Sequence, residues 1–314
     1  MGAMSRHGAA WPAYAAGAGA ILCWASLAAA IGESLRVLPP AQILFLGLLI
    51  AGLGLSAWQA WRGGRPLPAW PGWRIALLGI YGIWGFHTLL VLALSLAPPI
   101  EANVLNYTWP LWIVLLGAAL PGHRLRPSMA LGALAAFGGV VLVIAGPRLS
   151  GGLAALDVAS ARLGLGLALG AGFCWGSFTV LLRRSGAAER PLMGLFCLLS
   201  AVPAGVVMVL GGTPPLPAPA HWLPLLYLGL IPLGLSFLLW ERAVRAANVQ
   251  VLGVLSFFTP LLSTLLLSAV SGAPVRPGVW GGLACILGGS ALAGWGERRQ
   301  ALRGTTTLLG KDSS

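Results

Sequence analysis

Long apolar runs separated by short breaks constrain this chain more than any other feature. A helix needs roughly 20 consecutive apolar residues to cross a bilayer, and several runs here approach or exceed that length. Hydrophobic residues make up 58% of the 314 residues, whereas charged residues make up only 8%. A typical soluble domain carries roughly a quarter of its residues as charged ones. The sequence therefore predicts an all-α membrane protein that crosses the bilayer many times.

The breaks divide the apolar sequence into ten predicted transmembrane helices. Pro39-Pro40 and Pro214-Pro215 are typical of the connectors. The first run, preceded by Arg6 and His7, resembles a secretory signal, but we expect it to remain as a span because it has a partner later in the chain. The ten spans are predicted at residues 14–32, 42–61, 74–96, 101–120, 128–146, 163–182, 191–211, 222–241, 248–270 and 278–296.

The two sets of five spans repeat one sequence unit. With a shift of 150 residues, "RPSMALGALAAFGG" at 126–139 aligns with "RPGVWGGLACILGG" at 276–289. With a shift of 151, "CWAS" at 23–26 aligns with "CWGS" at 174–177. We interpret the chain as a tandem duplication, with one five-helix repeat over residues 1–148 and the other over residues 149–314. Because five is odd, the second repeat would enter the membrane from the opposite side, which gives two inverted repeats.

The basic residues predict the orientation of the chain. If both termini are cytoplasmic, 15 of the 19 basic residues fall on the cytoplasmic side. The other four are Arg36, Arg148, Arg162 and Arg276. The net charge of +12 does not indicate a nucleic acid partner, because these residues lie in short connectors and form no dense basic stripe. The four cysteines lie inside apolar runs without a CxxC pair, so we interpret them as small buried hydrophobic residues.

This pattern resembles the drug/metabolite transporter superfamily, and its repeats resemble EamA-type domains. The resemblance rests on the two sets of five spans, on Trp24 and Trp175 in the first helix of each set, and on the "TWP" and "FTP" prolines in the fourth. The pattern is also similar to the bacterial aromatic amino acid exporters. The resemblance implies a location in the bacterial inner membrane and alternating access to a central cavity, lined mainly by helices 1, 3, 4, 6, 8 and 9. It further implies export of amino acids, aromatic ones in particular, and of drug-like cations.

The fourth predicted helix carries the clearest polar cluster. Asn103, Asn106, Tyr107 and Pro110 follow helical spacing and share one face, which we expect to look inward because exposed amides would be unsatisfied in lipid. Pro110 removes the helical bond of the Asn106 carbonyl, and Pro260 does the same for Ser256. We expect the two prolines to bend or open helices 4 and 9 beside the pathway. A purely structural kink is the alternative.

Deep aromatic residues and one histidine complete the candidate site. Two interpretations of His87 stay open: a neutral imidazole bonded to a neighbouring helix, or a substrate contact or proton carrier, which we favour. For the deep tryptophans the alternatives are a cavity wall and plain helix packing. The candidate substrate-binding residues are Trp24, Tyr81, His87, Asn106, Tyr107, Trp109, Trp175, Ser256 and Phe257, with Pro110 and Pro260 as candidate kink and gating residues.

Other functions fit the sequence less well. A carrier of sugar phosphates would need Lys or Arg inside the pathway, and no basic residue lies near the middle of a predicted span. The chain has no GxSxG or HExxH motif and no paired carboxylates inside a span, so we expect neither an enzyme nor a bound metal or cofactor. A channel or a scaffold remains open.

The way transport is driven stays a choice between two hypotheses. Glu33, Glu101 and Glu241 are predicted at helix ends, in capping or snorkelling roles. Facilitated diffusion is therefore favoured, and proton-coupled efflux of drug-like cationic or amphipathic metabolites is the alternative. We expect a monomer whose partners are a small-molecule substrate and the lipid bilayer.

Overall fold

The computed structural model describes residues 11–64, 72–97, 99–121, 123–145, 159–186, 190–271, 274–275 and 277–309. Within these residues the regular secondary structure is helical throughout, with no strand. The predicted repeat boundary at 148 and 149 lies outside the described residues, as do Arg6, Arg65, Arg148, Arg276 and Lys311.

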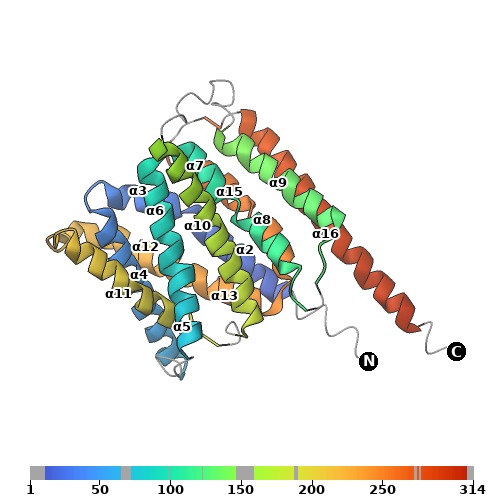
Figure 1. The fold of residues 1–314 in the computed structure, drawn as a ribbon, viewed down its shortest axis with the longest axis horizontal. Coiled ribbons are helices and arrows are strands. Elements are labelled where there is room, and N and C mark those ends of the chain that lie inside the picture. Colours follow the sequence, from blue (N-terminus) through green and yellow to red (C-terminus); the bar gives the residue numbers. More distant parts are fainter. Residues whose placement is uncertain are drawn as a thin grey trace.

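Apolar composition and frequent Pro and Gly breaks produce a series of helices (Figure 1). The first half of the chain forms α2 (Trp11–Ala25), α3 (Leu27–Leu35), α4 (Pro40–Trp61), α5 (Trp73–Ile80), the π-helical η1 (Tyr81–Gly85), α6 (Phe86–Leu96), α7 (Pro99–Asn106), α8 (Trp109–Gly117) and α9 (Pro127–Ala145). The second half forms α10 (Ala159–Arg184), α11 (Met193–Leu210), the short 3₁₀ turn η5 (Pro219–His221), α12 (Trp222–Leu228), the π-helical η6 (Gly229–Leu235), α13 (Ser236–Ala246), α14 (Val249–Leu255), α15 (Phe258–Ser271) and α16 (Pro277–Leu309).

Seven helical stretches of the described chain are long and apolar enough to cross a bilayer. They are Pro40–Trp61, Trp73–Leu96, Pro127–Ile144, Ala159–Arg184, Met193–Leu210, Pro219–Ala246 and Val249–Leu266, and Pro277–Ala293 is a shorter apolar helix. The predicted spans 14–32 and 101–120 are each divided into two helices, by breaks at Ser26 and at Tyr107 and Thr108. The helices confirm the prediction of an all-α, multi-pass membrane protein.

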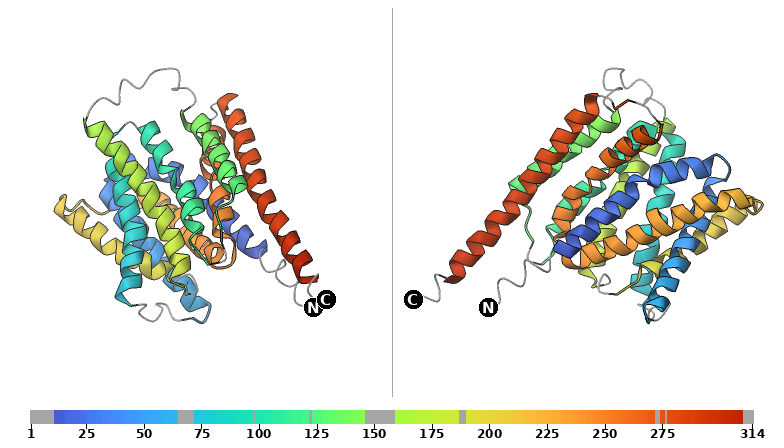
Figure 2. Two further views of the ribbon diagram at one scale, coloured as in Figure 1. Left: turned by 45° about the vertical axis from the view of Figure 1, so that its right-hand side comes forward. Right: turned by 180° about the vertical axis from the view of Figure 1, so that it is seen from behind.

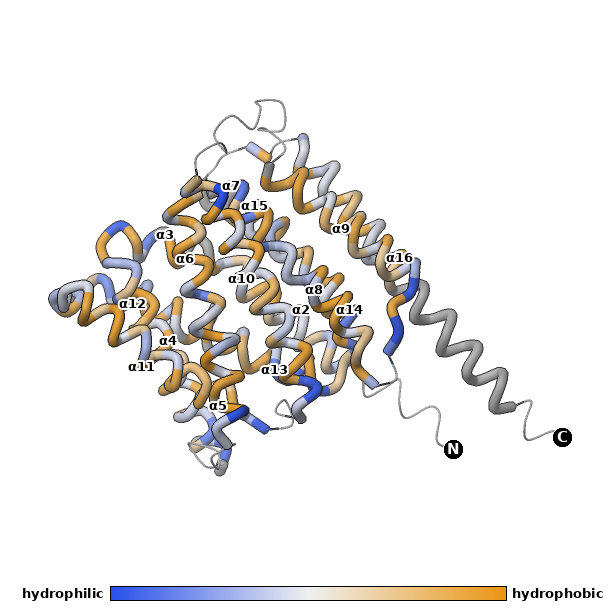
Figure 3. Tube along the Cα trace, in the orientation of Figure 1, coloured by the Kyte–Doolittle hydropathy of each residue, from blue (hydrophilic) through white to orange (hydrophobic). Residues whose placement is uncertain are grey.

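Polar residues lie mainly toward the ends of the helices. Figure 3 shows hydrophilic segments at the turns near α5 and α13, whereas the middles of most helices are apolar. A hydrocarbon core imposes this distribution, because helices satisfy their own backbone hydrogen bonds and present apolar side chains to lipid.

Two long helices contain a π-helical segment at matching positions of the repeat. Under the 150-residue shift, η1 aligns with residues 231–235 of η6. Pro232 lies inside η6 and cannot donate a backbone hydrogen bond, and the Ser236 hydroxyl donates to the Pro232 carbonyl. Segments of this kind widen a helix locally and often occur at functional sites.

Helices α9 and α16 run side by side along one edge of the molecule (Figure 1, Figure 2). Their contact depends on glycine: a Cβ at Gly132 would lie 2.4 Å from the Gly289 carbonyl oxygen, and one at Gly139 would lie 2.6 Å from that of Gly282. Small residues of this kind allow membrane helices to pack backbone against backbone. This edge is therefore a packing unit, apart from the aromatic centre described below.

The remaining major contacts also join the two halves of the chain. Helix α2 packs on α13, and α10 packs on α6, α7 and α8. Helix α4 packs on α11, and α8 packs on α14. The core lies where these helices meet, so the centre of the molecule is built from both halves.

Candidate functional site

Four tryptophans from four helices meet in the core. Trp24 (α2), Trp109 (α8), Trp175 (α10) and Trp240 (α13), the tryptophan cluster, are each at most 9% exposed. The Trp24 ring centroid lies 6.0 Å from that of Trp109, 5.8 Å from Trp175 and 5.1 Å from Trp240. Trp109 and Trp240 are 6.1 Å apart. Separations and tilts in this range are the ones aromatic pairs prefer.

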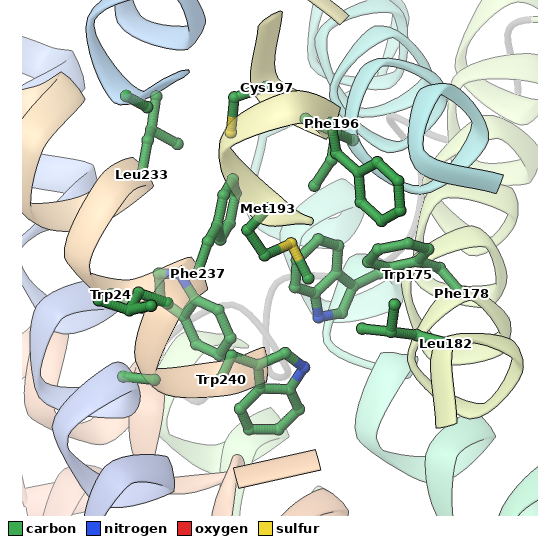
Figure 4. Packing of buried hydrophobic residues seen from close by; sticks show 14 of the residues in the cluster. Trp24, Trp175, Phe178, Leu182, Met193, Phe196, Cys197, Leu233, Phe237 and Trp240 are labelled. Carbon is green, nitrogen blue, oxygen red and sulfur yellow. The ribbon is translucent and has the colours of Figure 1, made fainter. Parts of the chain in front are cut away.

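Phenylalanines extend the cluster around Trp175. The ring of Phe86 lies 5.3 Å from that of Trp175, Phe178 lies 5.5 Å away and Phe237 lies 5.6 Å away. Figure 4 shows the rings of Trp175, Phe178 and Phe237 close to Trp24, Trp240 and Met193. The result is a continuous aromatic surface to which both halves of the chain contribute.

Glycines on α10 allow the fourth helix to approach this surface. A Cβ at Gly172 would lie 2.7 Å from the Thr108 hydroxyl oxygen and 2.8 Å from the Asn106 carbonyl oxygen. A Cβ at Gly176 would lie 2.8 Å from the Trp109 carbonyl oxygen. The G-x-x-x-G spacing on α10 thus brings the break between α7 and α8 against the backbone of α10.

The break between α7 and α8 lies directly before Pro110. Proline lacks an N–H and is tolerated in the first turn of a helix, so α8 begins at Trp109. The Thr108 hydroxyl donates to the Leu105 carbonyl over 2.6 Å. Asn106 is 6% exposed, and its side-chain oxygen has no hydrogen-bond partner among the described residues. The break therefore presents a buried acceptor next to α10.

The fourth helix of the second half breaks at the matching place. Helix α14 ends at Leu255 and α15 begins at Phe258, two residues before Pro260. The Ser256 hydroxyl donates to the Leu252 carbonyl over 2.7 Å, and the Thr259 N–H donates to the Ser256 carbonyl over 3.0 Å. Pro260 has no N–H to donate to the Ser256 carbonyl, so this carbonyl accepts from Thr259 in a tighter turn instead.

Phe257 lies in a different hydrophobic core from the tryptophan cluster, and Ser256 precedes it at the break. Both are fully buried, and the Phe257 ring lies 6.3 Å from that of Phe137 on α9. Phe257 belongs to a second hydrophobic core around α9, α14, α15 and α16. Tyr107 packs against this second core and also against the core that holds the tryptophan cluster. Of the candidate residues, Tyr107 therefore lies between the two hydrophobic cores.

Tyr81 and His87 lie on the third helix, beside α10. The Tyr81 hydroxyl is 2.7 Å from the Ser177 hydroxyl, and the Cys174 thiol donates to the Tyr81 carbonyl over 3.1 Å. The His87 Nδ1 lies 2.6 Å from the Ile83 carbonyl oxygen of its own helix. The histidine bond is therefore within one helix, and the Tyr81 bond is the one that joins two helices.

Comparison with known proteins identifies the family that has this architecture. The EamA-like transporter family matches residues 11–145 and 162–295. The chain belongs to this family. The EamA-like family consists of transporters, so the protein is a membrane transporter and not an enzyme.

Relatives of this EamA-like protein include three named aromatic amino acid exporter YddG. The protein from Ancylobacter novellus is 35% identical over 280 residues, which cover 87% of this chain and 94% of the relative. The Salmonella typhimurium protein is 27% identical over 64% of this chain and 69% of the relative. The Escherichia coli protein is 26% identical over 64% of this chain and 68% of the relative. A solved crystal structure aligns over 92% of this chain and 98% of the solved chain, with 34% sequence identity and a TM-score of 0.83.

Sequence reasoning missed two residues of this EamA-like core. Trp240 is fully buried in the tryptophan cluster, and its indole N–H points to the Thr179 hydroxyl at 3.4 Å. Glu241 is 1% exposed, and its carboxylate accepts the Leu192 N–H at the start of α11 over 2.9 Å. A capping role was one of the two roles predicted for Glu241, but its burial was not. The adjacent Arg242 made this segment resemble a membrane boundary.

Proposed function

We propose that the protein exports amino acids, with aromatic ones favoured, through a pathway bordered by the tryptophan cluster. The observation that carries this proposal is the meeting of Trp24, Trp109, Trp175 and Trp240 from both halves of the chain. Relatives named aromatic amino acid exporter support the substrate class. The proposed location is the bacterial inner membrane, with both termini in the cytoplasm.

The proposed architecture is a pair of inverted five-helix repeats, residues 1–148 and 149–314, which together cross the membrane ten times. Support comes from equivalent contacts made by the first helix of each half with the other half. Helix α2 packs on α13, and its counterpart α10 packs on α6. Helix α2 also packs on α15, and α10 packs on α7 and α8. The matched π-helical segments and the matched breaks before Pro110 and Pro260 add to this support. In this proposal α2 and α10 are the first helices of the two repeats, and both border the pathway during alternating access.

The chemistry of the cluster suits a flat apolar side chain. Indole rings stack on another ring and attract a cation to their faces, so they favour both the ring and the ammonium group of an aromatic amino acid. Three buried polar atoms of the fourth helix have no hydrogen-bond partner among the described residues: a Glu101 carboxylate oxygen and the Asn106 side-chain oxygen, both acceptors, and the Trp112 indole N–H, a donor. An amino acid carries one donor group and one acceptor group, which these atoms complement. We propose that Tyr81, Tyr107 and His87 contact the substrate beside them.

The proposed transport cycle is alternating access by facilitated diffusion. The tryptophan rings contact one another in this structure, so a substrate ring has to separate them. We propose that the breaks at Pro110 and Pro260 act as the bending points, because each already lacks the regular helical hydrogen bond. Ser256 and Phe257 would move with the second break and contact the substrate only after it bends.

Uptake into proteoliposomes tests the proposed substrate class. Purified protein should carry labelled Phe and Trp down their gradients faster than labelled Lys or Glu, because the cluster offers ring faces and no charged partner. Protein-free liposomes measure leakage. Equal rates for all four amino acids would contradict the aromatic preference.

The buried carboxylate of Glu241 favours a second candidate, proton-coupled efflux of cationic or amphipathic metabolites. A buried ionisable group within membrane helices often marks a proton pathway. An imposed pH gradient in the same liposomes discriminates the two hypotheses. Facilitated diffusion predicts rates that the gradient does not change, whereas a gradient-driven accumulation that Glu241→Gln abolishes would establish the second candidate.

A further inference from the structure

Two arginines from different helices lie over one tryptophan ring at the end of α4. Arg62 directly follows α4, and its guanidinium carbon lies 5.8 Å from the ring centroid of Trp58. Arg242 comes from α13, and its guanidinium carbon lies 5.0 Å from the same centroid. Both arginines are exposed, and Trp58 is half-buried. Each cation is attracted to the ring, but the two like charges repel each other.

Within the described part of the chain, little negative charge lies near the pair to offset this repulsion. Among the described residues the salt bridge that forms is Arg36–Glu33, which involves neither arginine of this pair. Glu241 is an electrostatic neighbour of Arg242, but the Glu241 carboxylate is buried and accepts the Leu192 N–H. An exposed anion at this edge of the protein would therefore be attracted by both guanidinium groups, which can donate charge-assisted hydrogen bonds.

An apolar strip on α4 ends at Trp61, the residue before Arg62. Leu53, Ala57 and Trp61 follow at intervals of four residues and are exposed, Leu53 to 55% and Trp61 to 80%. Residues four apart share one face of a helix. Tryptophan commonly lies where the hydrocarbon meets the headgroups, so Trp61 indicates that Arg62 lies at headgroup depth. The phosphate of a phospholipid lies at this same depth.

The rigidity of the site comes from its neighbours on α4 and α11. Gln59, next to Trp58, donates its side-chain N–H to the Pro191 carbonyl over 3.1 Å. The Glu241 carboxylate holds the following residue, Leu192. Helices α4, α11 and α13 are thus tied together at this end, which holds in place the backbone segments that carry Arg62 and Arg242.

We propose that Trp58, Arg62 and Arg242 form a binding site for the phosphate of an anionic phospholipid, with an acyl chain along Leu53, Ala57 and Trp61. Arginine pairs bind phosphate oxygens in a bidentate manner, and basic pockets between membrane helices bind lipid headgroups. The site is independent of the proposed amino acid pathway, because none of its residues belongs to the tryptophan cluster.

Native mass spectrometry of the purified full-length protein tests the site with phosphatidylglycerol as the probe and phosphatidylcholine as the comparison. The wild type should retain phosphatidylglycerol in preference to phosphatidylcholine. R62Q/R242Q should bind phosphatidylglycerol about 30-fold more weakly, which corresponds to about 2 kcal/mol for two arginines near the headgroups. R62K/R242K should stay within about threefold of the wild type, because lysine still attracts phosphate as a point charge.

The matched control is R36Q/R74Q, which removes the same charge from exposed arginines outside the pair. Arg36 belongs to the salt bridge with Glu33, and Arg74 lies over Trp73 at 5.3 Å. This control should bind phosphatidylglycerol as the wild type does. Equal losses in R62Q/R242Q and R36Q/R74Q, or wild-type binding by R62Q/R242Q, would overturn the proposal. Displacement of the lipid by millimolar inorganic phosphate would also overturn it, since the acyl chain would then contribute nothing.

Discussion

The hydroxyl of Tyr81 lies 2.7 Å from the hydroxyl of Ser177, and Tyr227 repeats this contact by donating to Ser26 over 2.8 Å. Ser26 and Ser177 end the matched "CWAS" and "CWGS" segments of the two halves. Each serine therefore bonds a tyrosine from the other half of the chain. The two bonds join the first helix of each half to the helix that contains the π-helical segment of the other.

A double-mutant cycle tests the Tyr81–Ser177 bond. Tyr81→Phe and Ser177→Ala should each lower the free energy of unfolding, and their coupling should be about 0.6 kcal/mol, the typical value for hydrogen bonds between membrane helices. Denaturant unfolding in detergent measures it. Ser95→Ala serves as the control partner, since its hydroxyl bonds only the Leu92 carbonyl of its own helix. Additive losses in Tyr81→Phe/Ser177→Ala would contradict the bond.

Substituting matched glycines should destabilise both halves alike. A Cβ at Gly79 would lie 2.2 Å from the Phe196 ring, and one at Gly229 would lie 2.6 Å from the Ile50 Cβ. Because these neighbours leave no room, Gly79→Ala and Gly229→Ala should each lower the free energy of unfolding by about 1–3 kcal/mol. Thermal unfolding in detergent measures the loss.

The matched control for these glycines is Gly138→Ala, because a Cβ at Gly138 would meet nothing within 4 Å. This substitution should leave stability unchanged or raise it by up to about 1 kcal/mol, since alanine favours a helix. Similar melting temperatures for Gly79→Ala and Gly138→Ala would show that the third helix does not pack on α11 as described.

Removing the Glu241 carboxylate should loosen the start of α11. Glu241→Ala leaves the buried Leu192 N–H without its acceptor, which should cost about 1–3 kcal/mol of stability. Glu241→Gln keeps an acceptor and should cost less. Denaturant unfolding of both variants measures the difference. Glu33→Ala is the control, because Glu33 pairs with Arg36 on the surface and exposed pairs contribute less than about 1 kcal/mol. A loss in Glu33→Ala as large as in Glu241→Ala would contradict the capping role.

The proline breaks should affect transport more than folding. Pro110→Ala and Pro260→Ala restore an N–H that can close the helix, and a net hydrogen bond contributes about 1 kcal/mol. If bending is required for each cycle, uptake should slow about fivefold at unchanged protein yield. Pro203→Ala within α11 is the control, since that proline lies outside the proposed bending points. Wild-type uptake by both variants would remove the breaks from the mechanism.

Much of the fold follows from the sequence because the bilayer restricts what apolar runs can become. The matched "CWAS" and "CWGS" segments predict equivalent positions for Trp24 and Trp175, and the structure brings their rings to 5.8 Å. Pro110 and Pro260 likewise indicate where the fourth helices break, since proline cannot supply the helical N–H. These features are encoded locally, so a single sequence reveals them.

The parts that depend on contacts distant in the chain could not be predicted in this way. Trp240 lies next to Glu241 and Arg242, which suggest a helix end, yet α13 packs on α2 and carries the ring into the core. The sequence predicts Phe257, which follows Ser256 at the break, as a substrate contact, whereas in the structure its ring lies 6.3 Å from that of Phe137. Helix packing decided both positions, and neighbouring residues gave no sign of it.

The ratio of Phe uptake to Leu uptake in proteoliposomes tests most directly whether the tryptophan cluster recognises aromatic substrates. A ratio is independent of the amount of folded protein. Trp109→Leu and Trp175→Leu should lower it about two- to tenfold, because ring–ring contacts contribute about 0.5–1.5 kcal/mol beyond apolar burial. Trp280→Leu, a change at an indole that is 57% exposed on α16, should leave the ratio at the wild-type value. An unchanged ratio in both cluster variants would contradict the account.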